Sequence, residues 1–154
     1  MDPLAPFEQM AAQEHGEVHL CLDTASGLKA IVAIDDERLG PALGGCRFLP
    51  YNNAEAALAD ALRLARAMTC KAALARLAHG GGKAVVIRPE GDFDRARLFE
   101  RFARFVDGLG GRYITTEDSG TSTDDMEVVR RITHHACGFP VASGGSGDPS
   151  VFTA

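Results

Sequence analysis

The sequence predicts an α/β domain: a mainly parallel sheet flanked by helices, with an antiparallel hairpin at one edge. Short β-rich runs alternate with helical stretches after residue 53, a pattern typical of parallel strands joined by helical crossovers. Before that point, two β-rich runs are separated by only Thr-Ala-Ser-Gly, which favours a hairpin turn at Gly27. With 154 residues, the chain is long enough for one domain with its own core.

The first third of the chain is expected to form a helix, the hairpin and a loop. An Asp-Pro pair near the N-terminus can cap and open a helix that continues to about Glu14. The two hairpin strands are expected at residues 17–23 and 28–35. Residues 36–53 are rich in glycine, proline and asparagine, so they are expected to be a loop.

The rest of the chain is expected to alternate helix and strand. Asn53 can cap a long helix from Ala54 to about Ala78, and the three glycines at 80–82 are expected to end it. The further elements expected are strands at 83–88, 112–116 and 136–139 and helices at 93–109 and 123–132.

Charge and composition exclude several classes of partner. The chain carries 16 Lys and Arg against 21 Asp and Glu, a net charge of −5, with no basic run of the kind that binds nucleic acid. No apolar run approaches the roughly 18 residues of a membrane span, and the N-terminus lacks the regions of a secretion signal. The sequence therefore predicts a soluble, cytoplasmic protein that binds neither nucleic acid nor membrane.

The cysteines and histidines do not form the pattern of a metal site. The four cysteines lie 25, 24 and 67 residues apart without a CxxC pair, so free thiols are expected. His134 and His135 are adjacent and would face opposite sides of a strand. No metal ligand is predicted.

Lys71 falls on the apolar stripe of the long helix. It lies three residues after Met68 and seven after Leu64, so helical spacing places it on the core-facing side. A lysine is rarely buried without a partner. Either the helix bends or the side chain reaches out to water, or the ammonium group waits at the edge of the core for an anion.

Lys83 and Asp118 are the other two candidates for chemistry. Lys83 follows three glycines, but the order helix, glycines, lysine, strand is not that of a phosphate-binding loop, and Ala84 replaces the required Ser or Thr. The glycines could simply end a helix before a surface lysine, or they could let a ligand approach Lys83. Asp118 follows a predicted parallel strand, where ligands bind in open α/β sheets, or it caps the next turn.

Five segments together resemble the Glu/Leu/Phe/Val dehydrogenase family, and its leucine, valine and phenylalanine dehydrogenases in particular. They occur in the family's order from about residue 17 to the last residue. The segments are LGPALGGCR at 39–47, ALRLA with MTCK at 61–71, GGGK at 80–83, RYITTED at 112–118 and GDPSVFTA at 147–154.

The resemblance implies roles for individual residues. Lys83 and Asp118 would be catalytic: Lys83 would polarise the substrate carbonyl and activate water, and Asp118 would relay protons to and from the amino group. The substrate would be bound by Gly44, Gly45, Met68 and Lys71, with Lys71 on the α-carboxylate. Ser150 and Thr153 would contact the cofactor. Lys71 beside Lys83 is expected to lower the pKa of the Lys83 ammonium.

The resemblance also implies the cofactor, the partners and the domain organisation. Residues 1–142 would form a substrate-binding and dimerisation domain, and 143–154 would begin the crossover to a missing nucleotide-binding domain. NAD or NADP would be bound mainly there, because the chain contains no GxGxxG. The substrates would be an L-amino acid and its 2-oxo acid, the chain alone would be inactive, and a homodimer or higher homo-oligomer is expected.

Two positions depart from the family's pattern, and one alternative function stays open. Cys46 and Cys70 stand where the family usually has Thr and a bulkier residue, often Tyr. Because Cys70 precedes Lys71, the departure bears on the shape of the substrate pocket. The alternative function is a stand-alone, non-redox module that binds amino acids or dimerises.

Overall fold

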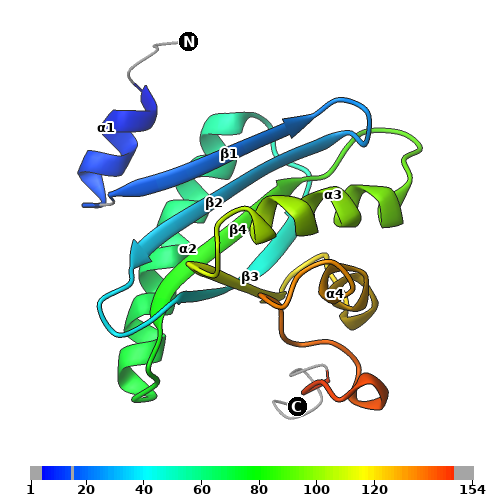
Figure 1. The fold of residues 1–154 in the computed structure, drawn as a ribbon. Coiled ribbons are helices and arrows are strands. Elements are labelled where there is room, and N and C mark those ends of the chain that lie inside the picture. Colours follow the sequence, from blue (N-terminus) through cyan, green and yellow to red (C-terminus); the bar gives the residue numbers. More distant parts are fainter. Residues whose placement is uncertain (1–4, 15, 148–154) are drawn as a thin grey trace.

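A five-stranded mixed sheet forms the centre of the protein (Figure 1). The structure is a computed structural model, and the description covers residues 5–14 and 16–147. The elements in chain order are α1 (Ala5–Ala12), β1 (Glu17–Asp23), β2 (Leu28–Asp36), β3 (Ala42–Leu49), α2 (Ala54–Leu74), β4 (Gly80–Ile87), α3 (Arg95–Asp107), β5 (Tyr113–Glu117), α4 (Thr123–Arg130) and a short 3-10 helix (Val141–Ser143).

The strand order confirms the predicted fold class. The strands lie in the order β1-β2-β4-β3-β5, and β4, β3 and β5 are parallel to one another. The β1–β2 hairpin stands at one edge, as predicted, and β2 is also antiparallel to β4. The sheet is therefore mixed, with its parallel half at the β5 end.

Helices bury both faces of the sheet. Helix α2 lies behind the sheet in Figure 1, and α3 and α4 lie in front of it. Alternate residues of β2 show the two faces, since Val32 packs into the core beneath α3 and α4, whereas Ile31 and Ala33 pack against α2. Both faces of the central strands are thus apolar, which is typical of a sheet covered on both sides.

The prediction of a loop over residues 36–53 was wrong for its central part. Residues 42–49 form β3, which pairs with β4 on one side and β5 on the other. The glycines are needed because the strands approach very closely: a Cβ on Gly44 would lie 1.7 Å from the carbonyl oxygen of Gly82. Close backbone packing, and not a turn, explains the composition of this segment.

The glycines at 80–82 do not end a helix. Helix α2 stops at Leu74, where the left-handed backbone of Arg76 (φ 55°) turns the chain, and the glycines form the first three residues of β4. A Cβ on Gly81 would lie 2.1 Å from the hydroxyl oxygen of Thr69 on α2. The glycines therefore let the helix and the neighbouring strands approach the start of β4.

The remaining expectations differ in detail from the structure. The hairpin strands and the helices at 93–109 and 123–132 are confirmed within a few residues. Residues 136–139 are not a strand, because only Ala136 pairs with Thr115, as an isolated parallel bridge. The predicted Asp-Pro cap at residues 2 and 3 lies outside the described residues. The four cysteines are free thiols. Over the described residues, no helix has the length and hydropathy to cross a membrane.

Candidate active site

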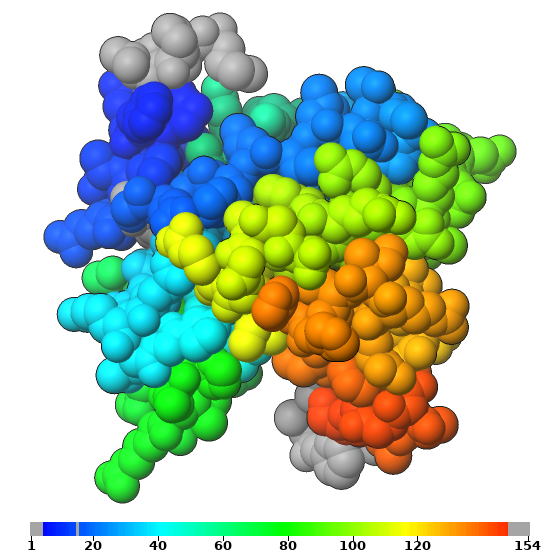
Figure 2. Space-filling model, in the orientation of Figure 1, coloured from blue at the N-terminus to red at the C-terminus, as the bar shows by residue number. Residues whose placement is uncertain are grey.

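A cavity of about 770 Å³ opens on the α2 side of the sheet, over β3 and β5. The C-terminal half of α2 forms one wall, and the segment that follows β5 forms the other. Figure 2 views the molecule from the opposite side, where its outline is notched between the projecting end of α2, in green, and the orange-to-red C-terminal segment. Helix α2 covers β2 and β4 but leaves this part of the sheet free for a ligand.

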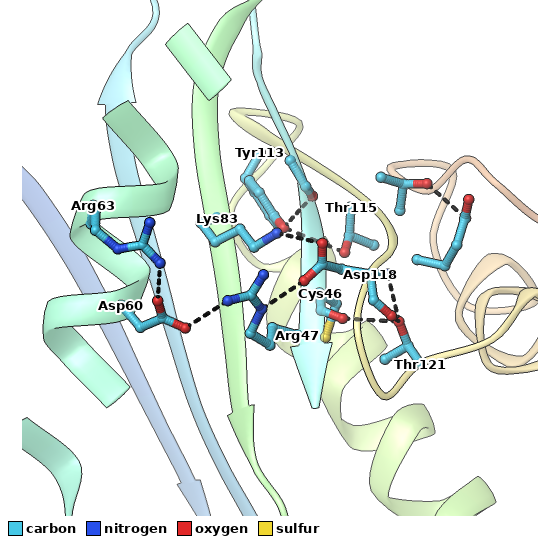
Figure 3. A network of polar contacts seen from close by, with 12 residues as sticks. Cys46, Arg47, Asp60, Arg63, Lys83, Tyr113, Thr115, Asp118 and Thr121 are labelled. Atoms are coloured by element: carbon cyan, nitrogen blue, oxygen red, sulfur yellow. Dashed lines mark hydrogen bonds and ion pairs between the residues drawn. The ribbon is translucent and has the colours of Figure 1, made fainter. Parts of the chain in front are cut away.

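Lys83 lies buried in the wall of this cavity and contacts Asp118. Its Nζ is 3.0 Å from Oδ1 of Asp118, and the residue is only 3% exposed (Figure 3). Burial lowers the pKa of Lys83 below its ordinary value, although the charge of Asp118 acts in the opposite direction. The structure thus contains a lysine whose ammonium form is disfavoured and whose nearest charged partner is a carboxylate.

Asp118 stays ionised despite its position. Burial acts to raise the pKa of its carboxyl group, but Lys83 and Arg47 outweigh burial and hold that pKa below its usual value. The Asp118 backbone is fixed by Thr121, whose hydroxyl oxygen accepts from the Asp118 N–H at 2.8 Å and donates to the Cys46 carbonyl at 2.9 Å. The carboxylate therefore stands on a loop that is tied to β3.

Arg47 is a residue of this candidate site that the sequence did not single out. Its Nε donates to Oδ2 of Asp118 at 2.8 Å, and its Nη1 donates to Oδ2 of Asp60 at 2.9 Å (Figure 3). The spacing in the sequence could have identified it. Arg47 lies two residues after Gly45 in a segment that forms a strand, so its side chain leaves the sheet on the same face as Gly45. That signal was lost because residues 36–53 were expected to be a loop.

Lys71 stands at the opposite wall of the cavity. It is exposed and lines the cavity, so its side chain is not buried among the core residues of α2 but lies at the edge of the core, within the alternatives that the sequence left open. The apolar stripe of α2 packs on the sheet through Ala61 and Ala65, but Lys71 lies where the cavity replaces the sheet beneath the helix. Burial is the main cause that lowers the pKa of Lys83, and the cation that adds to this effect is Arg47, in the place expected for Lys71.

Most of the predicted site residues lie together. The residues that line the same cavity are Gly45, Met68, Lys71, Lys83 and Asp118. Gly44 does not line it. The Gly44 carbonyl accepts a hydrogen bond from the Tyr113 hydroxyl at 2.6 Å, inside the sheet. Ser150 and Thr153 lie outside the described residues. Within residues 5–14 and 16–147, no cluster of three or more His, Cys, Asp or Glu side chains could hold a metal ion.

Gly45 leaves room beside the lysine and the carboxylate. A Cβ at this position would lie 2.7 Å from Cβ of Asp118 and 3.3 Å from Nζ of Lys83. The missing side chain thus opens the floor of the cavity where the two groups meet. Chemically, the arrangement can exchange a proton between an amine and a carboxylate in front of a bound molecule, while the ammonium group of Lys71 attracts an anionic part of that molecule.

A family model matches most of the chain. Residues 13–135 match the model described as "Glu/Leu/Phe/Val dehydrogenase, dimerisation domain". The chain belongs to this family. The match spans β1 to the segment after α4. It includes all the cavity-lining residues that lie between Leu43 and Thr123 in the sequence.

Relatives in the family are named as amino-acid dehydrogenases. Leucine dehydrogenase of Geobacillus stearothermophilus is 50% identical over 149 residues, which are 96% of this chain and 40% of the relative. Valine dehydrogenase of Streptomyces albus is 51% identical over 140 residues, 91% of this chain and 38% of the relative. Phenylalanine dehydrogenase of Bacillus thermotolerans is 47% identical over 154 residues, 100% of this chain and 40% of the relative. The chain spans about two fifths of the length of these curated relatives.

Solved structures share the fold. L-tryptophan dehydrogenase from Nostoc punctiforme superposes with a TM-score of 0.78 at 45% identity, covering 84% of this chain and 38% of that chain. A hetero-hexameric glutamate dehydrogenase from Thermus thermophilus superposes with a TM-score of 0.71 at 21% identity, covering 96% of this chain and 44% of that chain. The second likeness shows the fold alone.

Proposed function

We propose that this chain is the substrate-binding domain of an NAD(P)-dependent L-amino-acid dehydrogenase. The reaction would be the reversible oxidative deamination of an L-amino acid to a 2-oxo acid and ammonia. The observation that carries the proposal is the pair formed by the buried Lys83 and the partly buried Asp118, 3.0 Å apart, in a cavity that has Lys71 on its opposite wall. The names of the 47–51% identical relatives support it.

In this proposal, the α2 side of the cavity binds the substrate. Lys71 is exposed to the cavity and takes the α-carboxylate, because an ammonium group and a carboxylate attract each other strongly once water is displaced. Gly45 lets the substrate approach the backbone of β3, and Gly44 supports that backbone from within the sheet. Met68 stands beside Lys71 on the same wall, and its thioether side chain suits an apolar substrate side chain.

The Lys83–Asp118 pair carries the proton transfers. Lys83 donates a hydrogen bond to the substrate's carbonyl or carbinolamine oxygen, and in its amine form it accepts a proton from water. Burial lowers the pKa of Lys83, which makes its amine form more accessible than that of an ordinary lysine and supports the role in accepting a proton. Asp118 stays ionised and passes protons to and from the substrate's amino group.

The nicotinamide cofactor is assigned to a second domain. The described residues contain no strand followed by a glycine-rich turn and a helix, the unit that binds the pyrophosphate of a dinucleotide. We therefore assign residues 1–142 to substrate binding and dimerisation, and 143–154, with Ser150 and Thr153 beside the cofactor, to the crossover. When bound there, NAD or NADP would supply the hydride acceptor for the oxidation at Cα of the amino acid. The chain by itself would then be inactive.

The proposal includes self-association in the cytoplasm. Strand β1 is an edge strand that exposes Leu20 and Leu22, 71% and 68% accessible, and an apolar groove of about 550 Å³ lies between α1, β1 and α2. An uncovered edge with apolar side chains is suited to pairing with a second copy. The family description as a dimerisation domain supports a homodimer or higher homo-oligomer. The interspersed charges and the net charge of −5 favour neither nucleic acid nor an anionic membrane as a partner.

The proposal can be tested in a chimera. Residues 1–154 would replace the matching part of G. stearothermophilus leucine dehydrogenase, and NADH formation would be followed with L-leucine, L-valine and L-phenylalanine. Turnover that disappears in Lys83→Ala is expected. A folded chimera that binds an amino acid but does not oxidise any would refute the dehydrogenase role and favour the non-redox binding module.

A further inference from the structure

Arg47 links the Lys83–Asp118 pair to helix α2. We propose that Arg47 is a positioning residue: Asp60, which Tyr51 holds by a hydrogen bond, binds its guanidinium group, and that group holds the Asp118 carboxylate so that Oδ1 faces Lys83. The roles of Lys83 and Asp118 in this inference rest on the proposed function. The contacts themselves are features of the fold, and Figure 3 shows them as a chain of charged groups that runs from Lys83 through Asp118, Arg47 and Asp60 to Arg63.

The two oxygens of Asp118 have different partners. Oδ2 accepts from Arg47 Nε at 2.8 Å, and Oδ1 contacts Lys83 Nζ at 3.0 Å. A carboxylate that is bound at only one oxygen can rotate about its terminal torsion, which is broad for aspartate. Because Arg47 occupies Oδ2, rotation would break a charge-assisted hydrogen bond, and Oδ1 remains directed at the lysine.

Arg47 is itself held from the other side. Its Nη1 donates to Oδ2 of Asp60, which also accepts from the Tyr51 hydroxyl at 2.8 Å. The side chains of Arg47 and Asp60 are only 19% and 18% exposed. Ion pairs that water reaches poorly are screened less than surface pairs, so this contact restrains the guanidinium group more than an exposed bridge would.

Asp60 has a third partner, Arg63, that supplies a matched control. Arg63 donates to Oδ1 of Asp60 at 2.6 Å, but its side chain is 64% exposed and no contact joins it to Asp118. Arg47 and Arg63 thus bind the same carboxylate, one toward the cavity and one toward solvent. Only the inner arginine can transmit a restraint to the site.

The charge of Arg47 also serves the proton exchange. Asp118 alone would favour the ammonium form of Lys83, whereas Arg47 lowers the pKa of Lys83 and of Asp118 alike. A neighbouring cation therefore keeps the carboxylate ionised without fixing the proton on the lysine. This effect of charge would survive in Arg47→Lys, but the restraint by two hydrogen bonds in different directions would not, because an ammonium group lacks the planar fork.

The restraint on Arg47 can be measured in the 154-residue chain by NMR. The hydrogen exchange rate of the Arg47 Nε–H, which donates to Asp118, should rise by roughly tenfold or more in Asp60→Asn, because the charge-assisted bond from Nη1 that restrains the guanidinium group is weakened, and to a smaller extent in Tyr51→Phe. Arg63→Met should leave the rate unchanged. Equal exchange in wild type, Asp60→Asn and Tyr51→Phe would show that Asp60 and Tyr51 do not hold the guanidinium group, and would overturn the proposal.

The effect on the reaction is tested in the chimera with leucine dehydrogenase. Arg47→Lys should lower kcat by about tenfold or more, which is a smaller loss than the roughly 10²–10⁴-fold expected when proton transfer is removed. KM should stay within about twofold of its wild-type value. Asp60→Asn should lower kcat in the same direction, and it keeps the test available if variants of Arg47 do not fold. A kcat near wild type in Arg47→Lys, with Lys83→Ala inactive, would overturn the positioning role while the dehydrogenase function stands. An active Lys83→Ala would instead overturn the proposed function and leave the exchange experiment to decide on Arg47.

Discussion

Replacing Lys71 and Lys83 separately should produce two different kinetic defects in a complete dehydrogenase that contains this domain. Lys71 lies on the exposed wall of the cavity, whereas Lys83 is 3% exposed and paired with Asp118. A residue that binds a group in both the ground state and the transition state affects KM. A residue that acts on charges and protons that move during the reaction affects kcat.

The magnitude for Lys71 follows from Coulomb's law. At about 4 Å, an ammonium group and a carboxylate attract each other by about 1 kcal/mol in water and about 4 kcal/mol at an effective dielectric constant of about 20. Because Lys71 is exposed before the substrate binds, little is lost in the free protein when it is removed. Lys71→Ala should therefore raise KM by about 5- to 1000-fold with a smaller change in kcat.

The magnitude for Lys83 follows from its proton transfers. General acid–base catalysis contributes about 10²–10⁴-fold, so Lys83→Ala should lower kcat by that factor. Lys83→Arg should not restore the rate, because a guanidinium group does not release its proton near neutral pH. The space is also restricted, since Nζ of Lys83 lies 3.3 Å from where a Cβ on Gly45 would stand.

The assay is steady-state kinetics of oxidative deamination in the chimera, with Lys29→Ala as the control. Lys29 is an exposed lysine of β2 that does not line the cavity, so its removal changes charge by the same amount without touching the site. A kcat near wild type in Lys83→Ala would refute the catalytic role of Lys83. An unchanged KM in Lys71→Ala would refute its assignment to the substrate carboxylate.

The remaining predictions concern the site's floor, acid stability, self-association and the isolated chain. Gly45→Ala should displace Asp118 and reduce kcat, because the new Cβ would lie 2.7 Å from Cβ of Asp118. Gly108→Ala, whose Cβ would have no contact closer than 3.4 Å, should behave as wild type, and equal kinetics of the two variants would contradict the role of Gly45. The ion pairs hold the pKa values of Asp60 and Asp118 below the ordinary aspartate value of 3.8, so the stability that these carboxylates contribute is present above that pH and is lost as the pH falls through their folded pKa values. Urea midpoints measured between pH 6 and 2 should therefore fall below pH 4, and a flat profile would contradict the ion pairs. Leu20→Glu should shift light-scattering masses toward the monomer of 16.3 kDa, and a mass unchanged from wild type would remove β1 from the interface. The 154-residue chain with NAD and L-leucine should form no NADH above a blank, and measurable turnover would disprove the assignment of the cofactor to a second domain.

Periodicity predicted the parts of the fold that depend on local pattern. The hairpin strands and α3 carry their signals within the segment itself, as alternation in β1 and as the apolar face of Leu98, Phe102 and Phe105 in α3, where Leu98 and Phe102 are buried and Phe105 is partly buried. Each of these elements could be assigned without knowing its neighbours. Their boundaries differ from the structure by only a few residues.

Strand β3 and the start of β4 could not be predicted in this way. Their glycines are unfavourable in an isolated strand, and they are present because other backbone segments lie where side chains would be. The 1.7 Å between a Cβ on Gly44 and the Gly82 carbonyl is a property of two strands that are far apart in the sequence. Local propensity therefore predicted a loop and a helix end where the structure has the centre of the sheet.

Only part of the candidate site could be predicted from the sequence, because the rest depends on contacts between distant segments. The family's motifs identified Lys83 and Asp118 one at a time, but the restraint on Asp118 depends on contacts between residues 71 and 13 positions apart, from Arg47 to Asp118 and to Asp60. Helical spacing placed Lys71 toward the core, although the sheet does not extend beneath that part of α2. Only the tertiary arrangement shows which side of a helix faces a cavity.

The three glycines before Lys83 have a consequence for how such a site can diverge. The backbone there is enclosed by Asp36, by Thr69 on α2 and by the ring of Tyr113, so the origin of the Lys83 side chain is set by main-chain packing. Side chains that line the cavity, such as Leu43 and Met68, stand on other elements. They can change in size or polarity without moving the lysine. Substrate preference can therefore evolve while the reacting groups keep their geometry.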